Sequence, residues 1–123
     1  MKNNHNQKLF EHFARLKNPI VIIPPSSVTG CYPAPWDKSL EALQRLVDGY
    51  IEPCAPVELR ERGIELLCNE EGLLRGLDPN EHLFPFFLVG YIVAVGVEGE
   101  DFTGLSRAQF EYLCEWICHL QTI

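Results

Sequence analysis

The residues that most often carry chemistry in this chain are its five cysteines and four histidines, and they suggest one metal site to weigh. Cys114, Cys118 and His119 fall within six positions of a segment with a helical pattern. Residues four apart share a helical face, so two thiolates could bind one Zn²⁺ if other ligands came from Cys68 or His82. The paired C-x-x-C spacing of structural zinc sites is absent, and Cys114 lies in an apolar stripe. We therefore expect neither a metal nor a cofactor.

The cysteines also bear on compartment and catalysis. Their number is odd and their spacing irregular, which indicates reduced thiols and a cytoplasmic protein more than a disulfide scaffold. The longest apolar run, residues 83–97, is interrupted and too short to span a membrane, and the N-terminus is polar. A catalytic thiol needs a neighbouring base and an oxyanion hole, and no segment marks either. A thiol- or metal-dependent enzyme is therefore the third of three hypotheses.

The charge of the chain favours a basic partner. The formal net charge is −7, and residues 64–123 hold ten acidic side chains against two basic ones. Such a surface opposes direct binding of nucleic acid, whose phosphates are bound mainly by Lys and Arg. Four carboxylates in predicted turns, Glu70, Glu71, Glu100 and Asp101, could imitate phosphates and occupy a basic groove on a partner protein. The alternative is a solvated face that keeps a small protein soluble.

A second candidate surface is the proline-rich segment 24–38, which carries Tyr32 and Trp36. Long loops in small domains are often functional. Together with Asn69, at the head of an Asn-Glu-Glu-Gly turn, the two aromatic residues could form the walls of a pocket for a small ligand or a nucleotide. The alternative is that the aromatic rings only anchor the loop to the sheet.

The periodicity of the apolar residues predicts the elements that position these candidates. Helices are expected at residues 6–17, at 40–47 with Ser39 as N-cap, and from Arg107 onward behind a Ser106–Gln109 capping box. Strands are expected at 20–23, at 50–52, in a hairpin over 64–77, and over 83–97, where both faces are apolar as in a central strand. Pro53 and Pro56 confine the strand at 50–52 to an edge.

These elements predict a single α+β domain over residues 20–123, preceded by a helical extension at 1–19. The sheet is antiparallel or mixed with about four or five strands, and three helices pack mainly on one face. An exposed Trp116 or Tyr112 on the outer face of the last helix would indicate a homodimer.

Several short motifs also occur in an order that resembles a known family. They are Gly49-Tyr50-Ile51-Glu52, Cys68-Asn69-Glu70-Glu71-Gly72, Gly76-Leu77, Pro79-Asn80, Val89-Gly90, Val95-Gly96 and Phe102-Thr103-Gly104-Leu105. The pattern resembles an uncharacterised domain family of phages, plasmids and conjugative elements, whose genes often lie near antirestriction genes. The resemblance spans about residues 40–117 and leaves the first helix and the segment 24–38 unmatched.

What the resemblance implies is a non-enzymatic cytoplasmic protein of a mobile genetic element that binds and inhibits a host protein. This anti-defence or regulatory role is the leading hypothesis. A protein that sequesters a small ligand or a nucleotide is the second.

Overall fold

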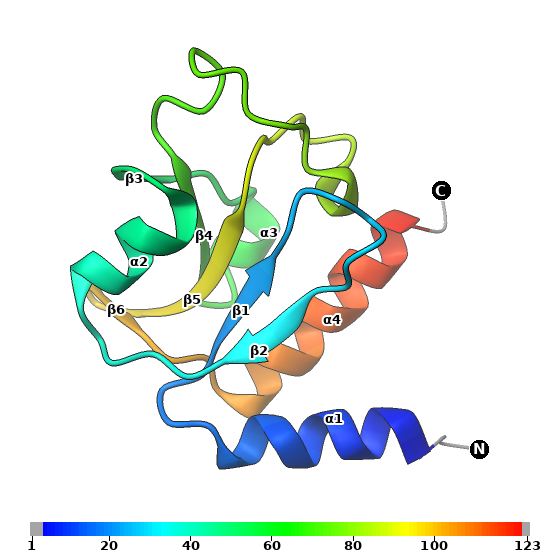
Figure 1. Ribbon diagram of the computed structural model, residues 1–123. Helices are drawn as coiled ribbons and strands as arrows, with labels where there is room; N and C mark the ends of the chain where they lie inside the picture. Colours follow the sequence, from blue (N-terminus) through cyan, green and yellow to red (C-terminus); the bar gives the residue numbers. More distant parts are fainter. Residues whose placement is uncertain (1–3, 122–123) are drawn as a thin grey trace.

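The structure, a computed structural model that describes residues 4–121, is a six-stranded antiparallel sheet with helices on both faces (Figure 1). The strand order is β2-β1-β5-β4-β3, and β6 pairs with the end of β5. The elements are α1 (Asn4–Arg15), β1 (Ile20–Ile23), β2 (Tyr32–Ala34), α2 (Leu40–Val47), β3 (Ile51–Pro53), α3 (Val57–Arg60), β4 (Ile64–Asn69), the 3₁₀ helix η1 (Glu81–Leu83), β5 (Ile92–Glu98), β6 (Asp101–Thr103) and α4 (Arg107–Gln121). The predicted single α+β domain is confirmed.

Successive apolar side chains along each strand point to opposite faces of the sheet, which explains why helices cover both faces. Val21, Ile23, Ile92 and Ala94 belong to the larger core cluster, which also includes Phe13 of α1 and Phe110 and Leu113 of α4. Their neighbours along the chain, Ile20, Val93 and Val95, pack instead with Leu43 and Val47 of α2. Two of the three long helices thus share one face, and α2 covers the other.

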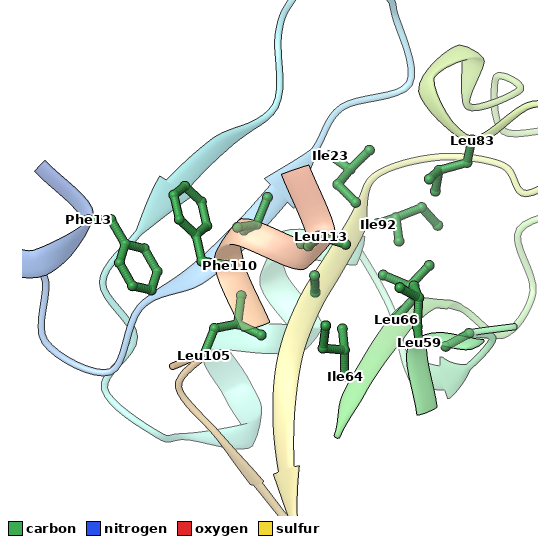
Figure 2. Close-up of a cluster of buried hydrophobic side chains, with 13 residues drawn as sticks. Phe13, Ile23, Leu59, Ile64, Leu66, Leu83, Ile92, Leu105, Phe110 and Leu113 are labelled. Atoms are coloured by element: carbon green, nitrogen blue, oxygen red, sulfur yellow. The ribbon is translucent and has the colours of Figure 1, made fainter. Parts of the chain in front are cut away.

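The helix α1 is part of the core of the domain. Phe13 is only 4% exposed, and its ring stacks on that of Phe110 with centroids 4.1 Å apart (Figure 2). Phe10 meets the same ring edge to face. The segment predicted as an extension therefore contributes apolar contacts to the face that α4 covers.

The predicted helix starts are confirmed in atomic detail. The Ser39 hydroxyl accepts a hydrogen bond from the Ala42 amide, as an N-cap should. Before α4, the Gln109 amide donates to the Ser106 hydroxyl and the Ser106 amide donates to the Gln109 side chain, which completes the capping box. The expected edge strand is also present, as β3, and it ends at Pro53.

Two strand predictions are wrong, and both concern the same end of the sheet. The hairpin over residues 64–77 does not form, because β4 pairs with β3 and β5 and ends at Asn69, after which residues 70–76 make successive turns. The long strand over residues 83–97 is shortened to β5, which begins at Ile92. Its predicted central position is confirmed, since β1, β4 and β6 all pair with it. Pro85 helps to explain the shortening, because proline cannot donate a hydrogen bond to a sheet.

Two edge strands were not predicted. The segment 24–38 contains β2, which pairs with β1 in the register Val21↔Pro33. The segment read as the turn and connection before α4 contains β6, which pairs with β5. Both are three residues long, and β2 contains Pro33, so neither shows an extended apolar alternation.

Candidate functional site

The end of the sheet where the strand predictions fail carries exposed apolar side chains on two loops. Exposed fractions are 78% for Leu73, 89% for Leu74, 63% for Phe84, 76% for Phe87 and 45% for Tyr91. We call these five residues the loop-end surface. At about 150–250 Å² per aromatic side chain, its three rings alone expose on the order of several hundred Å². The rings of Phe84 and Phe87 are in contact with each other, and contiguous exposed apolar surface often marks an interaction site.

Buried polar contacts hold the loop of Phe84 and Phe87 in place. Asn80 is 3% exposed and donates one amide hydrogen to the Ile23 carbonyl and the other to the Gly90 carbonyl, both at 2.9 Å. The His82 ring nitrogen Nε2 lies 3.0 Å from the Ser26 carbonyl oxygen and 2.8 Å from that of Thr29. The loop is therefore fastened to β1 and to the segment that follows it, although its aromatic tips face solvent.

The loop that carries Leu73 and Leu74 packs against the loop that carries Phe84 and Phe87, and two glycines allow the close approach. A Cβ added to Gly72 would lie 2.8 Å from the Val89 side chain, and one added to Gly90 would lie 2.9 Å from that of Leu77. The Gly90 amide also donates to the Asp78 carbonyl at 2.7 Å. These close approaches hold Leu73 and Leu74 beside the end of the sheet from which Phe84 and Phe87 project.

The backbone of Phe87 is strained. Its φ is +57°, in the left-handed region that bulky side chains rarely adopt. Its ring is largely exposed and meets only the ring of Phe84 among the aromatic pairs of the described chain, at 5.7 Å between centroids. A strained backbone that presents an exposed aromatic ring is typical of a binding loop, where local stability is given up for function.

The predicted ligand residue Asn69 is engaged in structural contacts. It is 5% exposed, and its amide donates to the carbonyls of Val47 and Asp48 at 3.0 and 2.9 Å. Its side-chain oxygen accepts from the Glu71 amide at 2.8 Å. Asn69 thus fastens the end of α2 to the end of β4. It fits against Gly49, where an added Cβ would lie 2.5 Å from the Asn69 amide nitrogen.

The structure does not bring Tyr32, Trp36 and Asn69 to one pocket. Trp36 is 6% exposed, donates from its indole to the Ser39 carbonyl at 2.9 Å, and lies between two hollows of about 560 and 540 Å³ on the α2 face. Tyr32 lies on the edge strand β2 and lines a separate hollow of about 250 Å³ toward α4. Asn69 lines none of these three hollows.

The four predicted partner-binding carboxylates fall into two pairs at opposite ends of the sheet. Glu70 and Glu71 follow β4 at the end that carries the loop-end surface, whereas Glu100 and Asp101 lie at the turn between β5 and β6. Because β4 is six residues long and its first four residues pair antiparallel with β5, the two pairs of carboxylates are separated by about the length of β4, roughly 20 Å. All four are exposed, but they do not form one patch.

The other residues that the sequence analysis singled out do not gather in one site. Among residues 4–121 no three His, Cys, Asp or Glu side chains are placed to hold a metal ion. Trp116 and Tyr112 are half-buried, since the Trp116 ring lies 5.5 Å from that of Phe86 and Arg62 lies 4.2 Å over the Tyr112 ring. In the same part of the chain no helix is long and apolar enough to cross a membrane.

Comparison with known proteins identifies a family. A family described as a domain of unknown function, DUF3846, matches residues 17–117. The chain belongs to the DUF3846 family. The match leaves α1 outside and includes the segment 24–38, which the motif resemblance had left unmatched. No curated protein and no solved structure matches the chain.

Sequence reasoning missed the exposed residues of this DUF3846 domain, because it assigned Leu73, Phe86 and Phe87 to strands. The signal that could have found them is the run Phe84-Pro85-Phe86-Phe87, in which a proline interrupts the aromatic residues. A proline within an apolar run argues against a central strand.

Proposed function

We propose that this protein acts by binding another protein through the loop-end surface, without chemistry of its own. The observation that carries the proposal is the exposed pair Phe84 and Phe87, which is held on a fastened loop with Phe87 in a strained conformation. Aromatic side chains in the centre of an interface supply much of its binding energy. A loop that is already ordered also loses less conformational entropy on binding.

The charge around this surface supports a basic partner protein. Glu70, Glu71 and Asp78 lie on the loop that carries Leu73 and Leu74, and all three are exposed. Acidic side chains around an apolar centre would steer a basic protein surface toward it. The same charges repel nucleic acid and anionic lipid headgroups.

The family resemblance supplies the finer form of the proposal. In this form the protein belongs to a phage, plasmid or conjugative element, acts in the cytoplasm, and occludes a host protein of a defence or regulatory system. Occlusion requires only a stable complex, and an interface of standard size covers about 800 Å² on each partner.

The two hollows beside Trp36 support a second candidate function, the binding of a small ligand. Their volumes, about 560 and 540 Å³, lie in the range of small-molecule sites. The first is bordered by Lys38, Glu98 and Asp101 and the second by Lys17 and Arg45, so a polar ligand would find charges of both signs.

Affinity purification of the tagged chain from its native host separates the two functions. We expect a stoichiometric protein partner with the wild-type chain and its loss with the double variant Phe84→Ser and Phe87→Ser. The matched control is Leu40→Ser with Val57→Ser, which removes two apolar residues that are 52% and 68% exposed on other parts of the molecule. The control should retain the partner, and both variants should keep the wild-type circular dichroism spectrum. A small molecule that copurifies without a protein would support the second function instead.

A further inference from the structure

Cys54 and Cys68 form a pair on the sheet edge that the proposed function does not use. Glu52 of β3 lies opposite Cys68 of β4, and the Cys54 amide donates to the Leu66 carbonyl at 2.8 Å. Cys54 is therefore diagonal to Cys68 on the same face of the β3–β4 pair. Both side chains are half-buried, so small molecules in solvent can reach them.

The two thiols are chemically unequal. A hydrogen bond from Cys54 is the main cause that lowers the pKa of Cys68, while the same contact, followed by burial, raises the pKa of Cys54. The Cys68 thiol donates to the Glu52 carbonyl oxygen at 3.4 Å, a weaker contact that favours the neutral thiol and acts against the effect of Cys54. Cys68 is thus the member of the pair that ionises first, and its neighbour is placed to react second.

We propose that Cys68 and Cys54 are a thiol–disulfide exchange site for small-molecule disulfides. The Cys68 thiolate attacks one sulfur of the disulfide, forms a mixed disulfide and releases the first small thiolate. Cys54 then loses its proton, and its thiolate attacks the Cys68 sulfur, which releases the second small thiolate and closes the Cys54–Cys68 bond. The small disulfide gains two electrons and becomes two thiols, and the protein pair loses the same two electrons.

The position of the pair permits closure. A disulfide needs its two sulfurs to approach to about 2 Å, and the hydrogen bond that lowers the pKa of Cys68 places the Cys54 thiol next to it. Diagonal positions hold their Cα atoms about 7–8 Å apart, slightly beyond the usual span of a disulfide, so closure requires the backbone at Cys54 to move toward β4. Cys54 directly follows Pro53, the last residue of β3 at the edge of the sheet, so this movement leaves the pairing of β4 with β5 intact. The product would link the edge strand to its neighbour.

Cys31 and Cys114 provide an internal comparison. Cys114 acts electrostatically on Cys31, but burial is the main cause that raises the pKa of each thiol to about 11, which leaves little thiolate near neutral pH. Cys118 is exposed and would react simply because reagents in solvent reach it, so the experiment below uses a variant that lacks this thiol.

The experiment treats the full chain carrying Cys118→Ser with oxidised glutathione and maps the thiols by mass spectrometry of peptides. We expect a Cys54–Cys68 disulfide without retained glutathione. Adding Cys54→Ser should trap a mixed disulfide on Cys68, and adding Cys68→Ser should slow the reaction at Cys54 by about tenfold or more. The control with Cys31→Ser and Cys114→Ser should close like its parent. Glutathione that stays on Cys68 of the parent, or a Cys68 that reacts no faster than Cys31, would overturn the proposal, and neither observation needs a variant of the pair.

Discussion

The rings of Phe84 and Phe87 meet nearly edge to face, at 75° and 5.7 Å between centroids, while 63% and 76% of the two residues stay exposed. Each of the two rings therefore packs more against the other ring than against the core. Phe87 keeps this contact at the cost of a left-handed backbone. The exposed pair is therefore kept at a cost in conformational energy.

The first prediction is that Phe87→Gly stabilises the fold while it abolishes partner binding. Glycine adopts a φ of +57° without strain, so the free energy of unfolding should rise by about 1 kcal/mol. Urea titration measures the change. Leu74→Gly is the matched control, because Leu74 is 89% exposed but has no positive φ, and this change should lower stability slightly. A loss of stability in Phe87→Gly equal to that of the control would show that the strain is not released.

The second prediction concerns the two acidic pairs. If the loop-end surface binds a basic partner, Glu70→Lys with Glu71→Lys should slow association by about tenfold or more at low salt, because electrostatic steering acts mainly on the association rate. Glu100→Lys with Asp101→Lys, with the same charge change at the other end of the sheet, should change it much less. Stopped-flow or surface plasmon resonance at two salt concentrations measures both. Equal effects would favour long-range attraction by net charge over a local site.

The sequence predicted well what depends on local chemistry and on alternation. Each capping signal spans only four residues, Ser39 to Ala42 in one case and Ser106 to Gln109 in the other. The strands around Ile22 and Val93 are apolar on both faces because helices cover both. Such signals do not require knowledge of distant contacts.

The loop-end surface could not be predicted in the same way, because its residues have the composition of a core. Leu73 and Phe87 resemble strand residues in sequence, and only the contacts of Asn80 with Ile23 and Gly90 show that the chain turns away from the sheet there. Asn69 was predicted from its turn position to bind a ligand, and its amide hydrogens are donated to the carbonyls of Val47 and Asp48 at the end of α2, a contact that the sequence pattern does not reveal.

The third prediction follows from that role of Asn69. Asn69→Ala should lower the free energy of unfolding by about 3 kcal/mol, because it removes three hydrogen bonds and leaves the Val47 carbonyl buried without its partner. Chemical denaturation measures the loss. The control is Glu70→Ala, at the neighbouring exposed position, which should change stability by less than about 0.5 kcal/mol. A small effect of Asn69→Ala would show that water replaces these contacts.

The fourth prediction is a difference in the pH dependence of thiol alkylation. Thiolates are the reactive form, so each rate should rise with pH until the pH passes the pKa of that thiol. The contact with Cys54 lowers the pKa of Cys68, whereas burial raises the pKa of Cys31 and Cys114 to about 11. The rate at Cys68 should therefore level off at a lower pH, while the rates at Cys31 and Cys114 still rise at about pH 10.

Glu52 provides the control for this pH profile. The carboxylates that act on Cys68 are Glu52 and Glu65, and each opposes the effect of Cys54 by raising the pKa of Cys68. Glu52 is exposed, so Glu52→Gln should leave the fold intact and move the Cys68 profile to lower pH. Labelling with iodoacetamide, followed by mass spectrometry of the separate peptides, measures each thiol in one sample. A Cys68 profile that runs parallel to that of Cys31, or that moves to higher pH in Glu52→Gln, would contradict the proposed ionisation of the pair.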